Sequence, residues 1–143
     1  MDSDLTCIDH VGIAVADLEE AKAFYQRAFG LQVVHEEVNQ EQGVREVMLA
    51  VGDSGSCIQL LAPLTLDSTI ARFLDRSGPG IQQVAYRVPD VRAVSERLTA
   101  AGVRMLYPEP RRGTAGSLVN FAHPKDCGGV LIELVQPAAD PGH

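Results

Sequence analysis

An internal repeat with a spacing of seventy-three residues is the strongest constraint on the fold. Residues 83–88 (QVAYRV) align with residues 10–15 (HVGIAV), and the turn that follows repeats as well, because Asp17 and Asp90 are also seventy-three positions apart. A fixed period of self-similarity indicates that one structural unit occurs more than once. The first prediction is therefore a fold built from two copies of one unit.

A helical pattern follows the repeated run in each half. The first helix is expected to begin at Asp17, where Glu20 three residues later completes a capping-box arrangement, and to end at Gly30. The second is expected to begin at Asp90 and to end at Gly102. Each half thus starts with a strand and continues into a helix.

Three strand-like runs then follow each predicted helix, bounded by turn signals. They lie at residues 31–38, 44–51 and 56–62 in the first half and at residues 103–107, 117–122 and 129–136 in the second. Each half is therefore a β-α-β-β-β module, at about 7–63 and about 80–137, with a linking helix at about 66–77. A chain of 143 residues suits one domain, 1–143, in which the two modules share a core.

The composition excludes several classes of partner. The formal net charge of −7 argues against nonspecific binding of nucleic acid or of an anionic membrane surface. Cys7, Cys57 and Cys127 are far apart and odd in number, so they are expected to be reduced and structural. The sequence shows neither a basic, apolar leader nor a long apolar run, and a cytoplasmic protein is expected.

One polar residue interrupts each of five strand-like runs. Successive strand residues point to opposite faces, so parity separates an apolar face that packs against a helix from a second face. The second face carries His10, Glu46, Gln59, Gln83 and Glu133. Singly, each has an ordinary role as a hydrogen-bonded, solvent-facing or edge-strand residue. In the repeat, however, His10 aligns with Gln83 and Gln59 with Glu133, which favours one shared site if the halves close around a cavity.

Four stretches of the sequence resemble the vicinal oxygen chelate (glyoxalase/bleomycin resistance/dioxygenase) superfamily, and within it the methylmalonyl-CoA epimerases. They are IDHVGIAVADLEEAKAFYQRAFGL, VREVMLAVGDSGSCIQLLAPL, QVAYRV and GSLVNFAHPKDCGGVLIEL, and they cover nearly the whole chain. The resemblance implies an α+β fold in which the paired modules form a cupped eight-stranded mixed sheet around a divalent metal. It also implies a homodimer that interconverts (2R)- and (2S)-methylmalonyl-CoA.

Carried over position by position, the resemblance implies metal ligands at His10, Gln59 and Glu133 and a catalytic base at Glu46. The fourth ligand of the family pattern is a histidine in a stretch like HHIA, whereas this chain reads QQVA and has Gln83 there. A glutamine oxygen binds hard or borderline cations, so we interpret Gln83 as a retained ligand that favours Co²⁺ first, and Mn²⁺ or Mg²⁺, over Zn²⁺. Loss of the metal site remains an alternative.

The residue types also suit proton transfer at a carbon. Epimerisation at the carbon between a thioester and a carboxylate removes one proton and returns another to the opposite face of a planar enolate. A bound metal would stabilise this enolate. Glu46 and Glu133 come from different halves and are the expected catalytic pair, with Glu133 also a metal ligand. The candidate side chains for binding the CoA phosphates of an acyl-CoA substrate are Arg104, Arg111, Arg112 and Lys125.

Other functions of the same fold stay open. A glutathione-dependent glyoxalase-type lyase or isomerase shares the metal site but does not need Glu46 as an added base. An extradiol dioxygenase needs two histidines and a carboxylate around iron, which Gln83 argues against. A metal-free drug-binding protein should have an aromatic cavity, whereas this chain has no Trp and 5% aromatic residues. Metal content separates these classes, and the sequence does not distinguish methylmalonyl-CoA from ethylmalonyl-CoA as substrate.

Overall fold

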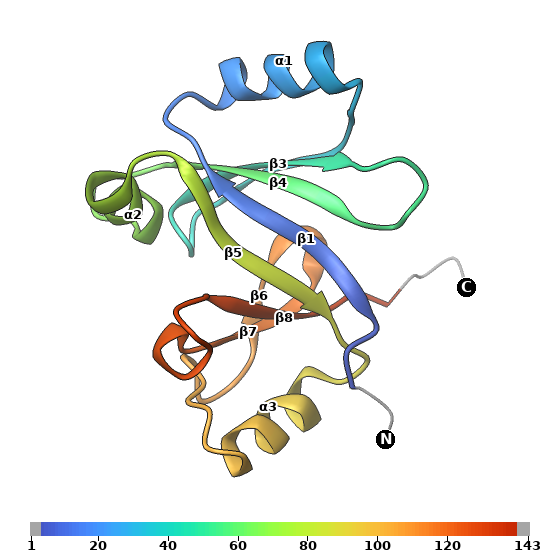
Figure 1. Cartoon of the computed structure of the whole chain (residues 1–143), viewed down its shortest axis with the longest axis vertical. Coiled ribbons are helices and arrows are strands. Elements are labelled where there is room, and N and C mark those ends of the chain that lie inside the picture. The colour runs from blue at the N-terminus through green and yellow to red at the C-terminus, as the bar shows by residue number, and fades with distance from the viewer. Residues whose placement is uncertain (1–3, 140–143) are drawn as a thin grey trace. The chain divides into compact units, whose positions relative to one another are not determined.

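The structure of the protein, a computed structural model, describes residues 4–139. This range contains eight β-strands, three α-helices and two short 3-10 helices, so the protein belongs to the predicted α+β class (Figure 1). The chain divides into two compact units. The first is His10–Gln82, and the second combines the residues up to Asp9 with those from Gln83 onward.

The first unit carries the first β-α-β-β-β module. Its strands are β1 (Cys7–Ala14, in this unit from His10 on), β2 (Gln32–Asn39), β3 (Val44–Ala50) and β4 (Cys57–Pro63). Their order in the sheet is β2-β3-β4-β1. β1 runs parallel to β4, and the other neighbouring strands are antiparallel, so the sheet is mixed as predicted.

Helix α1 (Leu18–Phe29) covers one face of this sheet. It begins where the side chain of Asp17 accepts a hydrogen bond from the Glu20 N–H at 3.0 Å, and it ends at Gly30, whose φ of 67° closes the last turn. The sequence predicted both ends. The core beneath the helix is made of apolar residues with the predicted strand parity, including Leu18, Val47, Leu49 and Leu60.

Helix α2 (Thr69–Ser77) is the predicted linking helix, and it begins where the side chain of Ser68 caps its first turn. Its Ile70 packs with Ala14, Val44 and Leu61. By strand alternation, Ala14 and Leu61 lie on the sheet face away from α1. Part of that second face is therefore covered by α2.

The second unit carries the other module. Its strands are β5 (Gly80–Arg87, in this unit from Gln83 on), β6 (Arg111–Arg112), β7 (Leu118–Ala122) and β8 (Ile132–Gln136), in the order β5-β8-β7-β6. β5 is parallel to β8, and the remaining pairs are antiparallel. Helix α3 (Val91–Ala100) packs Val91 and Val94 against Leu134.

The strand predicted at residues 103–107 is wrong. Within the described chain, this segment makes only an isolated bridge, between Met105 and Ala122. The Leu106 N–H donates to the Phe121 carbonyl at 2.8 Å, but regular pairing resumes only at β6.

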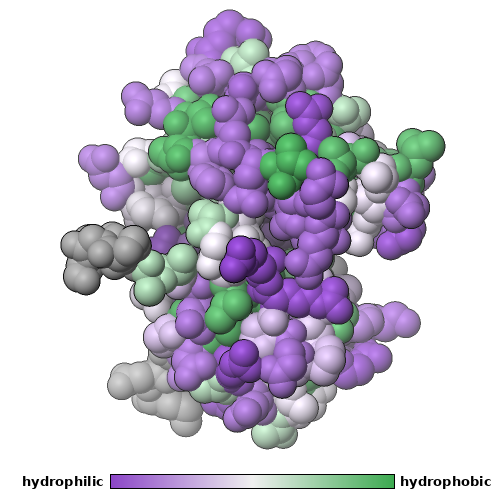
Figure 2. Space-filling view, turned by 180° about the vertical axis from the view of Figure 1, so that it is seen from behind, coloured by the Kyte–Doolittle hydropathy of each residue, from purple (hydrophilic) through white to green (hydrophobic). Residues whose placement is uncertain are grey.

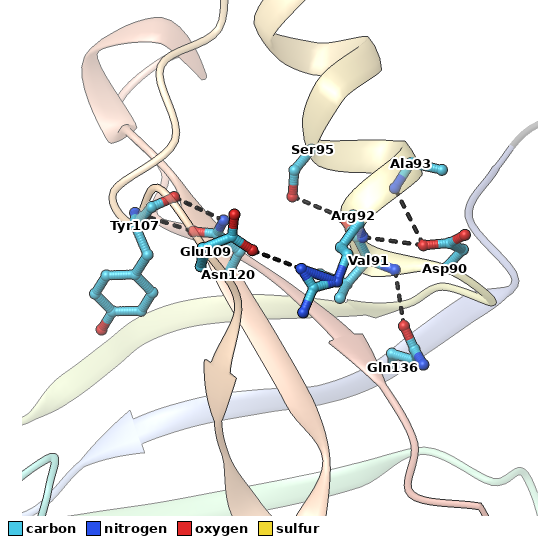
Figure 3. A network of polar contacts seen from close by, with 9 residues as sticks. All are labelled: Asp90, Val91, Arg92, Ala93, Ser95, Tyr107, Glu109, Asn120 and Gln136. Atoms are coloured by element: carbon cyan, nitrogen blue, oxygen red, sulfur yellow. Dashed lines mark hydrogen bonds and ion pairs between the residues drawn. The ribbon is translucent and has the colours of Figure 1, made fainter.

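Asn120 takes the place of a strand partner in this interrupted region. Its side chain is 1% exposed, and its Oδ1 accepts from the Tyr107 N–H at 3.2 Å while its Nδ2 donates to the Tyr107 carbonyl at 3.0 Å (Figure 3). Pro108 and Pro110 follow, and neither has an N–H to offer to a sheet. The segment therefore leaves the sheet after Tyr107.

Residues before His10 are built into the second unit. Leu5 packs in the apolar cluster under α3. The carboxylate of Asp9 accepts from Nε of Arg87 at 2.9 Å, and Asp4 pairs with Arg97. The second unit therefore contains both ends of the described chain.

One face of the molecule is mainly polar. Figure 2 shows hydrophilic residues over most of this face, with small hydrophobic areas between them. Exposed apolar side chains include Phe29, Val34 and Leu66, and scattered groups of this kind are ordinary on globular proteins. Within residues 4–139, no helix is long and apolar enough to cross a membrane.

Candidate active site

Glu46 and Gln59 form a buried polar pair in the first unit. Their exposed fractions are 5% and 2%, and Gln59 Nε2 donates to Glu46 Oε1 at 3.3 Å. The antiparallel register of β3 and β4 places Met48 opposite Gln59 and Leu61 opposite Glu46, so both polar side chains lie on one face. The predicted shared face is thus observed for these two residues.

His10 lies on the same face of this sheet. In the parallel pairing of β1 with β4, Gly12 lies beside Gln59, and His10 is two positions before Gly12. The imidazole is 2% exposed. Because Gly12 has no side chain, it places no bulk between His10 and Gln59.

Gln83 and Glu133 form the corresponding pair in the second unit. Each is 7% exposed, and Gln83 Nε2 donates to Glu133 Oε1 at 2.6 Å. Ala85 on β5 lies beside Glu133 on β8, and Gln83 is two positions before Ala85, which explains why the two side chains share a face. A hydrogen bond to a carboxylate is a strong one, and it orients the acid.

The two pairs use different positions of the repeat. Glu133 occupies the place that Gln59 has in the first half, at an offset of seventy-four. The place of Glu46 is taken by Val119, which lies opposite Val135 as Glu46 lies opposite Leu61. Each half nevertheless supplies one buried carboxylate held by one glutamine amide.

The four predicted metal ligands have donor atoms that suit a divalent cation. His10 offers an imidazole nitrogen, Gln59 and Gln83 offer amide oxygens, and Glu133 offers a carboxylate, a set typical of hard to borderline ions. Each glutamine uses its Nε2 toward a carboxylate, so its oxygen is the atom suited to a cation. Residues 4–139 hold no cluster of three or more His, Cys, Asp or Glu side chains that could bind a metal. The predicted ligand set has only His10 and Glu133 of these residue types, and its other two members are glutamines, so this result does not test it. The metal site stays a prediction.

The candidate CoA-binding cations differ in how they are held. Arg111 and Arg112 are exposed on β6, and Lys125 is exposed in the 3-10 helix Pro124–Asp126. Arg104 instead donates from Nε to Asp126 Oδ2 at 2.8 Å. The hydrogen bonds from Arg104 lower the pKa of Asp126 to about 2. Arg104 is therefore committed to an ion pair.

Asn120 and Ser117 are buried polar residues that sequence reasoning missed. Asn120 is the clamp on Tyr107, and its counterpart in the repeat is Val47, a core residue. The sequence held one signal for this role, because Asn120 has an amide side chain where the repeat has the core residue Val47. Ser117 is 5% exposed, and its Oγ has no hydrogen-bond partner within the described part of the chain.

Several known proteins of similar sequence and structure are named methylmalonyl-CoA epimerases. A family model described as "Glyoxalase/Bleomycin resistance protein/Dioxygenase superfamily" matches residues 9–121. The crystal structure of methylmalonyl-CoA epimerase from Mycobacterium tuberculosis is 57% identical, with a TM-score of 0.94 over 97% of this chain and 93% of that one. A variant of Streptomyces coelicolor methylmalonyl-CoA epimerase in complex with 2-nitronate-propionyl-CoA is 47% identical, with a TM-score of 0.92 over 94% of this chain and 99% of that one.

A sequence relative extends the likeness. The "Ethylmalonyl-CoA/methylmalonyl-CoA epimerase" of Cereibacter sphaeroides is 40% identical over 90% of this chain and 96% of that protein. Identity at this level over nearly full lengths, together with the shared fold, shows common membership. The chain therefore belongs to the Glyoxalase/Bleomycin resistance protein/Dioxygenase superfamily and, within it, to the methylmalonyl-CoA epimerase family of enzymes.

Proposed function

We propose that this enzyme catalyses the interconversion of (2R)- and (2S)-methylmalonyl-CoA. The observation that carries the proposal is the pair of buried carboxylates, Glu46 and Glu133, each oriented by a glutamine amide of its own half. Proton transfer in both directions needs one group that accepts a proton and one that returns it. The family membership supplies the substrate class.

The proposed reaction moves one proton off the substrate and another onto it. A carboxylate takes the proton from the carbon between the thioester and the carboxylate, and the C–H electron pair moves to the thioester oxygen to give an enolate. The second residue, as a carboxylic acid, delivers a proton to the opposite face and forms the new C–H bond. Glu46 and Glu133 exchange these roles for the other epimer, so each turnover leaves the pair with the same number of protons.

The proposed cofactor is one divalent ion held by His10, Gln59, Gln83 and Glu133. Co²⁺ is the first expectation, and Mn²⁺ and Mg²⁺ are the others, because amide and carboxylate oxygens outnumber the single imidazole. When bound, such an ion supplies positive charge that stabilises an enolate oxygen. The glutamines would then have two tasks, since their Nε2 atoms also orient the two carboxylates.

The remaining proposals concern recognition and assembly. Arg111, Arg112 and Lys125 are proposed to contact the CoA phosphates, supported by their exposure. A homodimer in the cytoplasm completes the proposal, and light scattering of the purified protein tests the dimer.

Proton exchange in heavy water tests the activity. Protein treated with a chelator is incubated with racemic methylmalonyl-CoA, alone and after addition of Co²⁺, Mn²⁺, Mg²⁺ or Zn²⁺, and the uncatalysed rate is subtracted. We expect metal-dependent loss of the α-proton signal by NMR, with both epimers consumed in an assay coupled to an epimer-specific enzyme. No acceleration with any ion, together with no bound metal, would replace the proposal with a binding role.

A further inference from the structure

Arg111 is held differently from four other arginines of the second unit. Arg87, Arg92, Arg97 and Arg104 each pair with an Asp or Glu. Arg111 has no ion pair within residues 4–139, and its Cζ lies 3.9 Å from the centroid of the Tyr107 ring. A guanidinium stacked on a ring keeps its N–H groups at the edge of its plane available for an anion.

The Tyr107 ring is itself fixed from two sides. The Asn120 side chain bonds both the N–H and the carbonyl of Tyr107, and in Figure 3 the ring extends away from these bonds. The Phe121 ring meets the Tyr107 ring edge-on, at 5.9 Å between centroids and 86° between planes. Phe121 lies opposite Glu133 in the sheet, so the Tyr107–Arg111 stack adjoins the strand pair that carries a proposed catalytic residue.

Asn120 stands where the first half has a core valine. Asn120 lies opposite Leu134 as Val47 lies opposite Leu60, and Val47 and Asn120 are each 1% exposed. A buried amide is unfavourable unless hydrogen bonds compensate it. Here the compensating partners include both backbone groups of Tyr107. The amide therefore holds Tyr107 at the point where the chain leaves the sheet.

We propose that Asn120 and Tyr107 are positioning residues that hold the Arg111 guanidinium as a phosphate-binding group for the CoA part of the substrate. The inference rests on the proposed function and narrows it, because it selects Arg111 among the three candidate cations. A planar fork of N–H donors matches a phosphate better than an ammonium does. The pairing of β6 with β7 fixes the Arg111 backbone, and the ring fixes its end.

A truncated substrate isolates the phosphate contact. Methylmalonyl-CoA and methylmalonyl-pantetheine have the same reacting carbon, but only the first carries phosphates. We expect Arg111→Gln to raise KM for the CoA ester about five- to tenfold with kcat unchanged, and to leave KM for the pantetheine ester unchanged. Tyr107→Leu should raise KM for the CoA ester about two- to fivefold, whereas Tyr107→Phe, which keeps the ring, should restore the wild-type value.

The positioning role of Asn120 is tested with the same two substrates. Asn120→Val introduces the residue of the first half, and we expect the same selective rise in KM for the CoA ester. If this variant does not fold, the Tyr107 pair of variants decides the question. Arg27→Gln on α1 is the control for loss of one positive charge and should change neither KM.

The inference is overturned by an equal rise in KM for both esters, by a fall in kcat without a change in KM, or by unchanged KM values in Arg111→Gln. Calorimetry with free CoA separates this inference from the proposed function. If the protein lacks epimerase activity but binds CoA, and Arg111→Gln weakens that binding, the phosphate site is supported and the proposed reaction is rejected. If the protein is an epimerase and Arg111→Gln binds CoA as tightly as the wild type, the reaction is supported and the phosphate site is rejected.

Discussion

Replacement of Glu46 by glutamine tests the proposed division of labour between the two carboxylates. Glu46 is 5% exposed, and its Oε1 accepts a hydrogen bond from Gln59 Nε2 at 3.3 Å. A glutamine has the same shape, and its oxygen can accept the same bond. The change from a charged to a neutral acceptor should lower the free energy of unfolding by about 1 kcal/mol, or a few degrees in Tm.

The effect on turnover should be much larger. Removal of a general acid–base group lowers the rate by about 10²- to 10⁴-fold, which corresponds to about 3–5 kcal/mol of activation free energy. Both directions should be affected, because Glu46 accepts a proton from one epimer and returns one to the other. Glu133 should still exchange the proton on its own side, so we expect deuterium to enter one epimer without inversion.

The assay follows each pure epimer in heavy water, by NMR for exchange and by a coupled enzyme for inversion. Glu96→Gln, an exposed acid on α3, is the matched control and should retain the wild-type rate. Interconversion by Glu46→Gln at more than about a tenth of the wild-type rate would refute its role as a base.

Three further predictions concern stability and metal choice. Leu60→Ala, which empties part of the core under α1, should lower the free energy of unfolding by about 2–5 kcal/mol in urea denaturation, while Leu66→Ala at a surface position should be nearly neutral. The hydrogen bonds from Arg104 lower the pKa of Asp126 from 3.8 to about 2. Between these pH values the folded protein binds fewer protons than the unfolded chain, so it loses stability as the pH falls through them. Asp126→Asn should reduce this loss of stability in denaturation curves measured across the same pH range. Gln83→His should increase the thermal stabilisation by Zn²⁺ relative to that by Mn²⁺ in a melting assay, and an unchanged ratio of the two effects would contradict Gln83 as a ligand.

Much of the fold was predictable because both halves of the sequence carry the same pattern of strands and helix. The capping pattern at Asp17, the stop at Gly30 and the strand parity of Val47 and Leu60 all describe contacts between near neighbours or alternating positions, and each is confirmed. Parity also placed Glu46 and the other four polar residues on the face away from the helices, but it did not by itself predict that all five are buried.

The hydrogen-bond partners could not be predicted. Parity places Gln83 and Glu133 on one face, but it does not show that the Nε2 of one donates to the other across parallel strands. The predicted strand at 103–107 failed for a related reason. A run of apolar residues looks the same whether a backbone or the side chain of Asn120, thirteen residues from Tyr107, supplies the partner.

The place of Leu5 and Asp9 in the second unit has a consequence for biosynthesis. These residues are made before the first unit, yet Arg87 and the apolar residues of α3 and β8 are made only after the whole first unit. The first unit can close as soon as β4 and α2 are complete, whereas the second waits for β8. A growing chain therefore carries a finished first unit before Leu5 and Asp9 can make their contacts, and a fragment that starts at Gln83 would lack part of its own core.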